Sequence, residues 1–226
     1  MKSNKIFYNG MYEGNLNISP SKKHIPGWYK DIKAYNNSNI EFIEDNPVKS
    51  LKSCIPFLDS LTSGYMVELW SDIHCKKQNG SHIVTYAANN PVGVRNVKSL
   101  SKSTIPSGHS EQEYTWISPF FIKLPKGYSA LVTHPLNRFD LPFTTISGIF
   151  DGFLAEGNIP FFIKDDFEGV IESGTPIFQI LPFKTENWEI EKNKDLKNDS
   201  YDYASKVKQK FFGYYKNNIW TKKEYL

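Results

Sequence analysis

The stretch from Gly127 to Asp151, GYSALVTHPLNRFDLPFTTISGIFD, holds the residues of this chain that are best suited to bind an anion. Arg138 is one of two arginines, and a guanidinium can grip a phosphate through two parallel hydrogen bonds. The other interpretation is that Arg138 is a solvated or ion-paired charge at the edge of a tightly turned β-segment. Asp151 is open to two interpretations as well, because an aspartate beside a glycine, here Gly152, commonly caps its own backbone in a turn.

A second group with chemical potential lies in GHSEQEY, where His109, Glu111 and Glu113 alternate with other residues. On a strand this spacing puts all three side chains on one face, and a histidine with two carboxylates suits a divalent metal ion. Alternating polar residues in a loop give the same pattern without any metal. No Ser-His-Asp or Cys-His set stands out elsewhere in the sequence.

Composition limits what these residues can belong to. The chain has 226 residues, of which 39% are hydrophobic and 23% are charged, so it can bury a substantial core. Its 27 lysines and arginines are interspersed with 24 acidic residues, and because no basic stripe is visible, nucleic acid is not an expected partner. No segment approaches the ~20 apolar residues that a membrane helix requires, so we expect no membrane association.

The cysteines and the basic residues indicate the compartment and the source. Cys54 and Cys75 form neither a C-x-x-C zinc motif nor a disulfide framework, and both are expected to be buried thiols. The preference for lysine over arginine is typical of AT-rich genomes, which indicates a phage or an AT-rich bacterium. We therefore expect a cytoplasmic protein, or a virion component if a phage encodes it.

Three consecutive zones are predicted along the chain. Residues 1–47 form an irregular N-terminal arm, residues 48–184 a β-domain, and residues 185–226 a charged connector followed by an amphipathic helix. Within the arm we expect one strand at 40–43, and we expect Trp28 to pack the arm onto the main body.

The elements of the last two zones follow from hydrophobic spacing. A short helix with Pro56 in its first turn and Gly64 at its end opens the β-domain. The polar stretch 87–110 is expected to be a long loop or hairpin excursion. In the last zone, Tyr203 and neighbours at helical spacing predict a helix that Asp199 or Ser200 caps. Runs rich in β-branched and aromatic residues predict strands at 66–70, 82–86, 114–124, 128–134, 159–164, 169–172 and 177–183.

Two resemblances arise from these segments. HIPGWYKDI, CIPFLDSLTSGYMVELWSDI, LPKGYSALVTHPLNRFDLPF and SGTPIFQILPFKTENW are similar to segments of a family of phage and bacterial proteins that has no established activity, and they cover most of the chain. Residues 121–181 also resemble, in order, the trimeric dUTPase and dCTP deaminase fold. The expected fold is therefore mainly β, a dUTPase-like distorted barrel of the β-clip type, with the arm and the C-terminal helix added.

The dUTPase resemblance implies a set of site residues. LPKGYSALVTHPLNR is similar in layout to the segment that leads to the phosphate-binding Arg-Ser motif, which implies roles for Asn137 and Arg138. SGIFDGFLAEGNI resembles the hairpin of the nucleoside pocket, with Gly148 and Asp151 at matching positions, and ESGTPIFQILPF contributes Gln179. In the enzymes the aspartate orients a water molecule for attack on the α-phosphorus while a metal ion neutralises the triphosphate. Asp151 is thus the implied catalytic residue.

Three departures from the enzyme pattern bear on activity. Pro135, Leu136 and Asn137 stand about where Arg-Ser-Ser is expected, Leu154 replaces a tyrosine, and the glycine-rich C-terminal arm is replaced by the connector and helix. We therefore expect a non-catalytic binding or structural protein, for which the sequence indicates no particular cofactor. The alternative is a nucleotide hydrolase or deaminase with altered motifs that uses Mg²⁺. Expected partners are further copies of the chain, as a trimer in the manner of that fold, a nucleotide-like ligand, or other phage proteins.

Overall fold

The computed structural model describes residues 4–10, 18–36, 48–79, 81–88, 90–95, 105–117, 120–154, 158–209 and 213–226. The chain divides into two compact units. The first, called the β unit, combines Met1–Pro26, Ser60–Thr185 and Tyr225; the second, called the helical unit, combines Gly27–Asp59, Glu186–Glu224 and Leu226. Each unit is thus built from stretches that are distant in sequence, whereas the predicted zones are consecutive.

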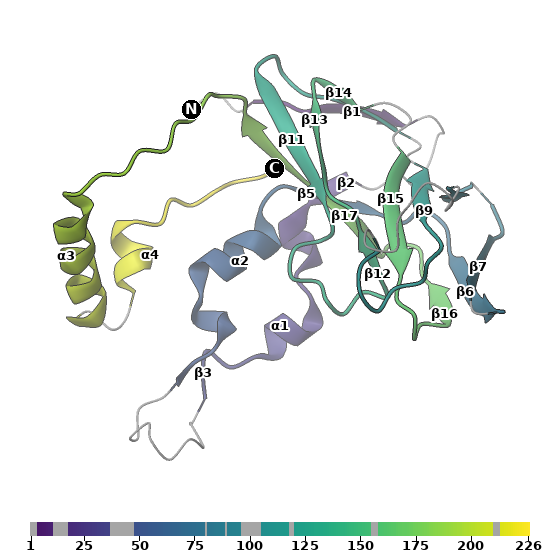
Figure 1. Ribbon diagram of the computed structural model, residues 1–226, viewed down its shortest axis with the longest axis horizontal. Helices are drawn as coiled ribbons and strands as arrows, with labels where there is room; N and C mark the ends of the chain where they lie inside the picture. The colour runs from purple at the N-terminus through teal and green to yellow at the C-terminus, as the bar shows by residue number, and fades with distance from the viewer. Residues whose placement is uncertain are drawn as a thin grey trace. The chain divides into compact units, whose positions relative to one another are not determined.

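The described residues of the β unit form four antiparallel sheets (Figure 1). Their strand orders are β1-β10-β14, β13-β11-β17-β5-β2, β12-β15-β9-β8 and β16-β6-β7. The strands are β1 (Phe7–Gly10), β2 (Ile18–Pro20), β5 (Tyr65–Glu68), β6 (Ile73–Gln78), β7 (Ser81–Tyr86), β8 (Val92–Val94), β9 (Tyr114–Ile117), β10 (Phe120–Lys123), β11 (Tyr128–Thr133), β12 (Phe143–Thr145), β13 (Gly148–Asp151), β14 (Phe153–Leu154), β15 (Asn158–Ile163), β16 (Gly169–Ile171) and β17 (Pro176–Lys184).

The mainly β prediction is confirmed, and every predicted run overlaps at least one strand. The run 114–124 is divided between β9 and β10. No sheet of the described residues closes on itself, because the strand order of each sheet is open, and the dUTPase-like part of the prediction stays a prediction. The long predicted loop 87–110 includes β8 and a β-bridge from His109 to Lys164.

The N-terminal arm also differs from the prediction. It contributes β1, which pairs with β10, and β2, which pairs with β5. A 3-10 helix, η1 (Ser21–His24), follows β2. These strands are three or four residues long, too short for a period-two pattern to be visible in the sequence. The predicted strand at 40–43 lies outside the described residues.

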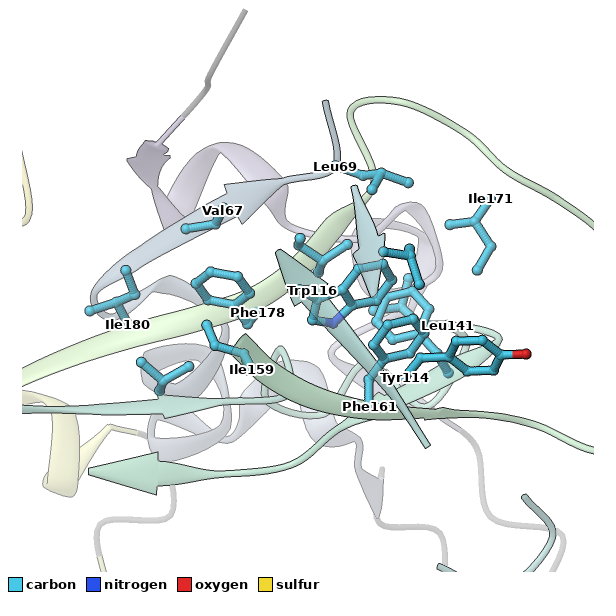
Figure 2. Packing of buried hydrophobic residues seen from close by; sticks show 14 of the residues in the cluster. Val67, Leu69, Tyr114, Trp116, Leu141, Ile159, Phe161, Ile171, Phe178 and Ile180 are labelled. Atoms are coloured by element: carbon cyan, nitrogen blue, oxygen red, sulfur yellow. The ribbon is translucent and has the colours of Figure 1, made fainter. Parts of the chain in front are cut away.

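The core of the β unit includes aromatic side chains from β9, β12 and β15. Figure 2 shows Tyr114 and Trp116 of β9 close to Phe161 of β15. Trp116 stacks on Phe161 with ring centroids 3.6 Å apart, and Phe143 meets Trp116 edge-on at 5.1 Å. The indole Nε1 of Trp116 donates to Thr145 Oγ1 at 3.0 Å, and that hydroxyl donates to the carbonyl of Ile177 at 2.6 Å. Burial of a phenylalanine ring stabilises the fold by roughly 1.5–3 kcal/mol because its apolar surface leaves water. The hydrogen bonds of Trp116 and Thr145 avoid the penalty of unsatisfied buried polar groups.

The helical unit contains α1 (Gly27–Asp31), a short ladder between β3 (Tyr35–Asn36) and β4 (Val48–Lys49), and the 3-10 helix η2 (Leu51–Ser53). It also holds α3 (Leu196–Gln209) and α4 (Tyr214–Asn218), while α2 (Ile55–Thr62) begins in it. Trp28 packs edge-on against Phe57 of α2, with ring centroids 6.3 Å apart, so its predicted packing role takes the form of a contact inside this unit.

The predicted helices are present with changed ends. α2 carries Pro56 in its first turn, as expected. α3 begins at Leu196, before the predicted caps Asp199 and Ser200, and Gly213 takes the left-handed conformation with φ 82° at the start of a separate α4. The left-handed backbone of Gly213 interrupts the helical pattern directly before Tyr214.

Among the described residues, no helix is long and apolar enough to cross a membrane. Cys75 is buried, and this burial raises the pKa of its thiol to about 12. The prediction of a buried thiol is wrong for Cys54, which is exposed because it precedes α2 instead of lying on the apolar face of that helix.

Candidate functional site

The loop HPLNRFDLP, residues 134–142, follows β11 and contains the predicted anion-binding residues. His134 organises the loop: its Nε2 donates to the carbonyl of Arg138 at 3.0 Å, while its Nδ1 accepts from the backbone N–H of Thr145 at 3.3 Å. These two contacts require the neutral ring with its proton on Nε2. Burial lowers the pKa of His134 below its ordinary value, which agrees with the neutral form.

Gln179 connects this loop to the end of α2. Its side chain is fully buried. The amide oxygen accepts from the backbone N–H of Leu136 at 2.9 Å, and the amide nitrogen donates to the carbonyls of Ser60 and Ser63 at 3.0 and 2.7 Å. Asn137, with φ 60°, adds a bond from its Nδ2 to Ser60 Oγ at 2.6 Å. Both predicted ligand-binding amides therefore hold the loop in place.

Arg138 is engaged by a carboxylate of its own loop. Its Nε donates to Asp140 Oδ1 at 2.9 Å and its Nη2 donates to Asp140 Oδ2 at 2.8 Å, while Nη1 lies 3.5 Å from the carbonyl of His24. The arginine side chain is 11% exposed and that of Asp140 is 38% exposed. The guanidinium N–H groups that would bind a phosphate thus already bind the carboxylate of Asp140.

His24 and Glu68 form a neighbouring polar group that the sequence analysis did not single out. Ser19 Oγ lies 2.7 Å from His24 Nε2, and Glu68 Oε1 lies 3.2 Å from the same nitrogen. A relay of the Ser-His-Asp kind needs the hydroxyl and the carboxylate on opposite ring nitrogens, so this geometry is not one. Burial lowers the pKa of His24, with a smaller opposite effect of Glu68 and smaller lowering effects of Arg138 and Lys23. No spacing in the sequence connects these residues.

Asp151 lies away from the loop. It is paired with Ser129 at the start of β11, whereas Gly148 is paired with Val132 and Gln179 with Thr133 near the end of that strand. Four residues of antiparallel strand span ~13 Å. Within one chain, the structure therefore gathers Asn137, Arg138, Gly148 and Gln179 at one end of β11 and places Asp151 at the other.

The carboxylate of Asp151 has an internal partner as well. Ser129 Oγ lies 2.5 Å from Asp151 Oδ1 and 2.6 Å from Thr185 Oγ1. The turn after β13 is at Gly152, which has a φ of 64°. The carbonyl of Gly152 accepts from the backbone N–H of Leu124 at 2.7 Å. These bonds join the end of β13 to β11 and to Thr185 after β17, and the turn at Gly152 to Leu124, the residue after β10.

The predicted metal residues have separate partners. His109 Nδ1 donates to the carbonyl of Ser107 at 3.0 Å, which leaves Nε2 to accept from Thr144 Oγ1 at 2.8 Å. Glu113 is buried and accepts from Arg95 Nη1 at 3.1 Å, and Glu111 is exposed. In the part of the chain that the structure describes, no group of three His, Cys, Asp or Glu side chains is placed to hold a metal ion.

Comparisons with known proteins add no family to this description. A scan of the chain against protein-family models found no match, and a search of curated proteins found none either. The resemblances to the phage and bacterial family and to the dUTPase fold stay predictions from the sequence.

Proposed function

We propose that this chain is a non-catalytic assembly protein that uses a β-scaffold of the dUTPase type to present two exposed apolar side chains to a partner. The observation that carries the proposal is the exposure of Trp188 and Ile190 just after β17. Trp188 is 84% exposed and Ile190 is exposed over its whole side chain. Exposed tryptophan and isoleucine on an irregular segment are typical of residues that become buried at a protein interface.

The positions of the residues that a nucleotide hydrolase would use also support a non-catalytic function. Arg138 is bound by Asp140, Asp151 accepts from Ser129, and the two candidate residues lie at opposite ends of β11. Catalysis of phosphoanhydride hydrolysis depends on charged groups that converge on one phosphorus atom. Within one chain these residues do not converge. A phage origin, which the lysine bias indicates, fits an assembly role.

The first experiment is a panel of nucleoside triphosphates with Mg²⁺, in which released pyrophosphate is measured and thermal stability is recorded in parallel. We expect no turnover and no thermal shift. A ligand at about 100 times its dissociation constant would add about 2.7 kcal/mol to stability, which such a scan detects. Turnover of any nucleotide that is lost in Asp151→Asn would contradict the proposal and establish the enzyme.

A second candidate function, nucleotide binding without hydrolysis, is favoured by the clustering of Asn137, Arg138 and Gly148 at one end of β11. Asp140→Asn tests it, because this change removes the carboxylate charge that occupies the guanidinium. If Arg138 is a latent phosphate clamp, Asp140→Asn will bind inorganic phosphate or a nucleotide more tightly than the unmodified chain, and Asp140→Asn with Arg138→Ala will not. Equal binding by all three proteins would reject the clamp.

A further inference from the structure

An exposed aromatic patch covers one face of the sheet β1-β10-β14. Phe7, Lys123 and Phe153 are paired directly across the three strands, so their side chains lie on the same face. Phe121, two residues from Lys123, shares this face, and its ring stacks on that of Phe153 with centroids 6.0 Å apart and 7° between the planes. We call Phe7, Phe121, Lys123 and Phe153 the aromatic patch.

The aromatic patch is open to solvent and carries positive charge. Phe7 is 62% exposed and Phe153 is 56% exposed, and Lys123 is exposed between them. The opposite face of the same sheet holds Phe120 and Ile122, which belong to the core. The sheet thus buries one row of apolar side chains inside the β unit and presents a second row outward, which a sheet that only closes a core does not need.

The same chain carries a segment of complementary character. Residues 186–191, ENWEIE, place Trp188 and Ile190 two positions apart, with Glu186, Glu189 and Glu191 around them and no basic residue. In an extended conformation, Trp188 and Ile190 project on one side, together with Glu186. We call residues 186–191 the acidic segment.

The residue before the acidic segment is held in place by hydrogen bonds. Thr185, the residue before it, donates its backbone N–H to the carbonyl of Gly127 at 2.8 Å, and its hydroxyl lies 2.6 Å from that of Ser129. The departure of the segment from the β unit is therefore held by two bonds. A segment that follows an ordered residue loses less conformational entropy when it binds a partner.

We propose that the acidic segment of one copy docks on the aromatic patch of a second copy, with Trp188 and Ile190 against Phe7 and Phe153 and the negative charge of the segment attracted by Lys123. This inference rests on the proposed assembly function and names its partner. Charge selects the acidic segment over a second aromatic patch, because two facing patches would bring Lys123 against Lys123. The contact is heterologous, so repetition of it closes a ring or extends a filament.

The test uses two double variants of the full chain, each of which removes one half of the contact. Trp188→Ala with Ile190→Ala removes the apolar side chains of the acidic segment, and Phe7→Ser with Phe153→Ser removes the exposed rings of the patch. Sedimentation equilibrium is expected to show an oligomer for the unmodified chain and an association at least about tenfold weaker for each variant. Val94→Ser and Tyr201→Ala, at residues that are 71% and 65% exposed, are matched controls and should leave association unchanged.

Mixing the two double variants gives the sharper result. Each variant keeps one intact half, so an equimolar mixture should form a dimer through one segment and one patch, although neither variant associates alone. Circular dichroism of each variant establishes that it is folded. A mixture that stays monomeric, while the unmodified chain is an oligomer, would overturn this docking and leave the assembly function in place through another surface.

Two other outcomes would overturn the inference in different ways. An unmodified chain that is monomeric at every accessible concentration would remove both the docking and the assembly function. A monomer that binds a single-stranded oligonucleotide, and loses this binding in Phe7→Ser with Phe153→Ser but not in Trp188→Ala with Ile190→Ala, would identify the patch as a stacking platform for bases instead.

Discussion

The side-chain amide of Gln179 forms hydrogen bonds with three backbone groups of the β unit. Gln179 was predicted to bind a ligand, and these bonds instead predict that it contributes to stability. Gln179→Leu keeps the approximate volume but leaves the N–H of Leu136 and the carbonyls of Ser60 and Ser63 without their partner. Unsatisfied buried groups cost about 1–3 kcal/mol each, and some relaxation is expected, so we predict a loss of roughly 2–4 kcal/mol in urea denaturation.

Gln78→Ala is the matched control for this prediction, because Gln78 is an exposed glutamine near the end of β6. Its effect should stay within about 0.5 kcal/mol. If Gln179→Leu left the free energy of unfolding unchanged, the bonds that we describe would not be holding the loop.

His134 predicts how stability depends on pH. Its Nδ1 must accept from Thr145, and protonation would put a second hydrogen there. Because burial lowers the pKa of His134 in the folded chain below the 6.5 of the unfolded chain, the unfolded state binds more protons between these two values. The contribution of His134 to stability is therefore complete above about pH 6.5 and is lost as the pH falls through the folded pKa.

The measurement is denaturant unfolding at a series of pH values from about 8 down to 5, a range that brackets the ordinary histidine pKa. His134→Gln should be less stable than the unmodified chain near neutral pH but should lose less stability on acidification. His74→Gln, at an exposed histidine of β6, is the control and should follow the unmodified chain. An acid dependence that is equally steep in His134→Gln and the unmodified chain would show that His134 is not responsible.

At the scale of elements, the turn from α2 into β5 depends on Gly64. Its φ is 71°, and a Cβ built there would lie 2.1 Å from the carbonyl oxygen of Ile180 in β17. Gly64→Ala therefore adds a backbone clash to the left-handed conformation, and we expect a loss of more than about 4 kcal/mol or failure to fold.

Gly127 is a control that separates the backbone clash from the cost of the left-handed conformation. Its φ is 81°, yet a Cβ there would meet nothing within 4 Å, so Gly127→Ala suffers only the conformational penalty of about 1–2 kcal/mol. Thermal unfolding of both variants measures the difference. Equal losses for Gly64→Ala and Gly127→Ala would mean that the approach of β17 to Gly64 is unimportant.

How far the elements could be predicted depended on their length and on their neighbours. α2, β11 and β17 carry regular patterns of apolar residues over six to nine positions, and these patterns predicted their bounds to within a few residues. β1 and β13 are four residues long and are strands because of the partners they pair with, which no local pattern records.

The candidate site was predictable only in part, for a related reason. Residue types indicated Arg138 as an anion-binding group, but whether it is available depends on Asp140, two residues away, whose orientation is set by the turn. His24 joins Arg138 from more than a hundred residues away, through the pairing of β2 with β5. Such long-range contacts leave no spacing signal in the chain.

For the whole molecule, the proposed docking of the acidic segment on the aromatic patch combines two forces with opposite responses to salt. The glutamates of the acidic segment and Lys123 attract each other electrostatically. Salt screens this attraction, because the Debye length falls from about 8 Å at 0.15 M to about 3 Å at 1 M. Burial of Trp188 and Ile190 is not screened, and excluded salts such as sulfate strengthen it.

We therefore predict that association weakens when sodium chloride is raised from about 0.05 M to 0.5 M, because the charge attraction is screened over this range. Sodium sulfate at the same ionic strength should weaken it less, since sulfate favours apolar burial while screening charges equally. Lys123→Gln should flatten the chloride dependence, whereas Lys206→Gln, in α3 and outside the contact, should not. Sedimentation equilibrium measures all of these, and an association that strengthens in sodium chloride would mean that apolar burial alone joins the copies.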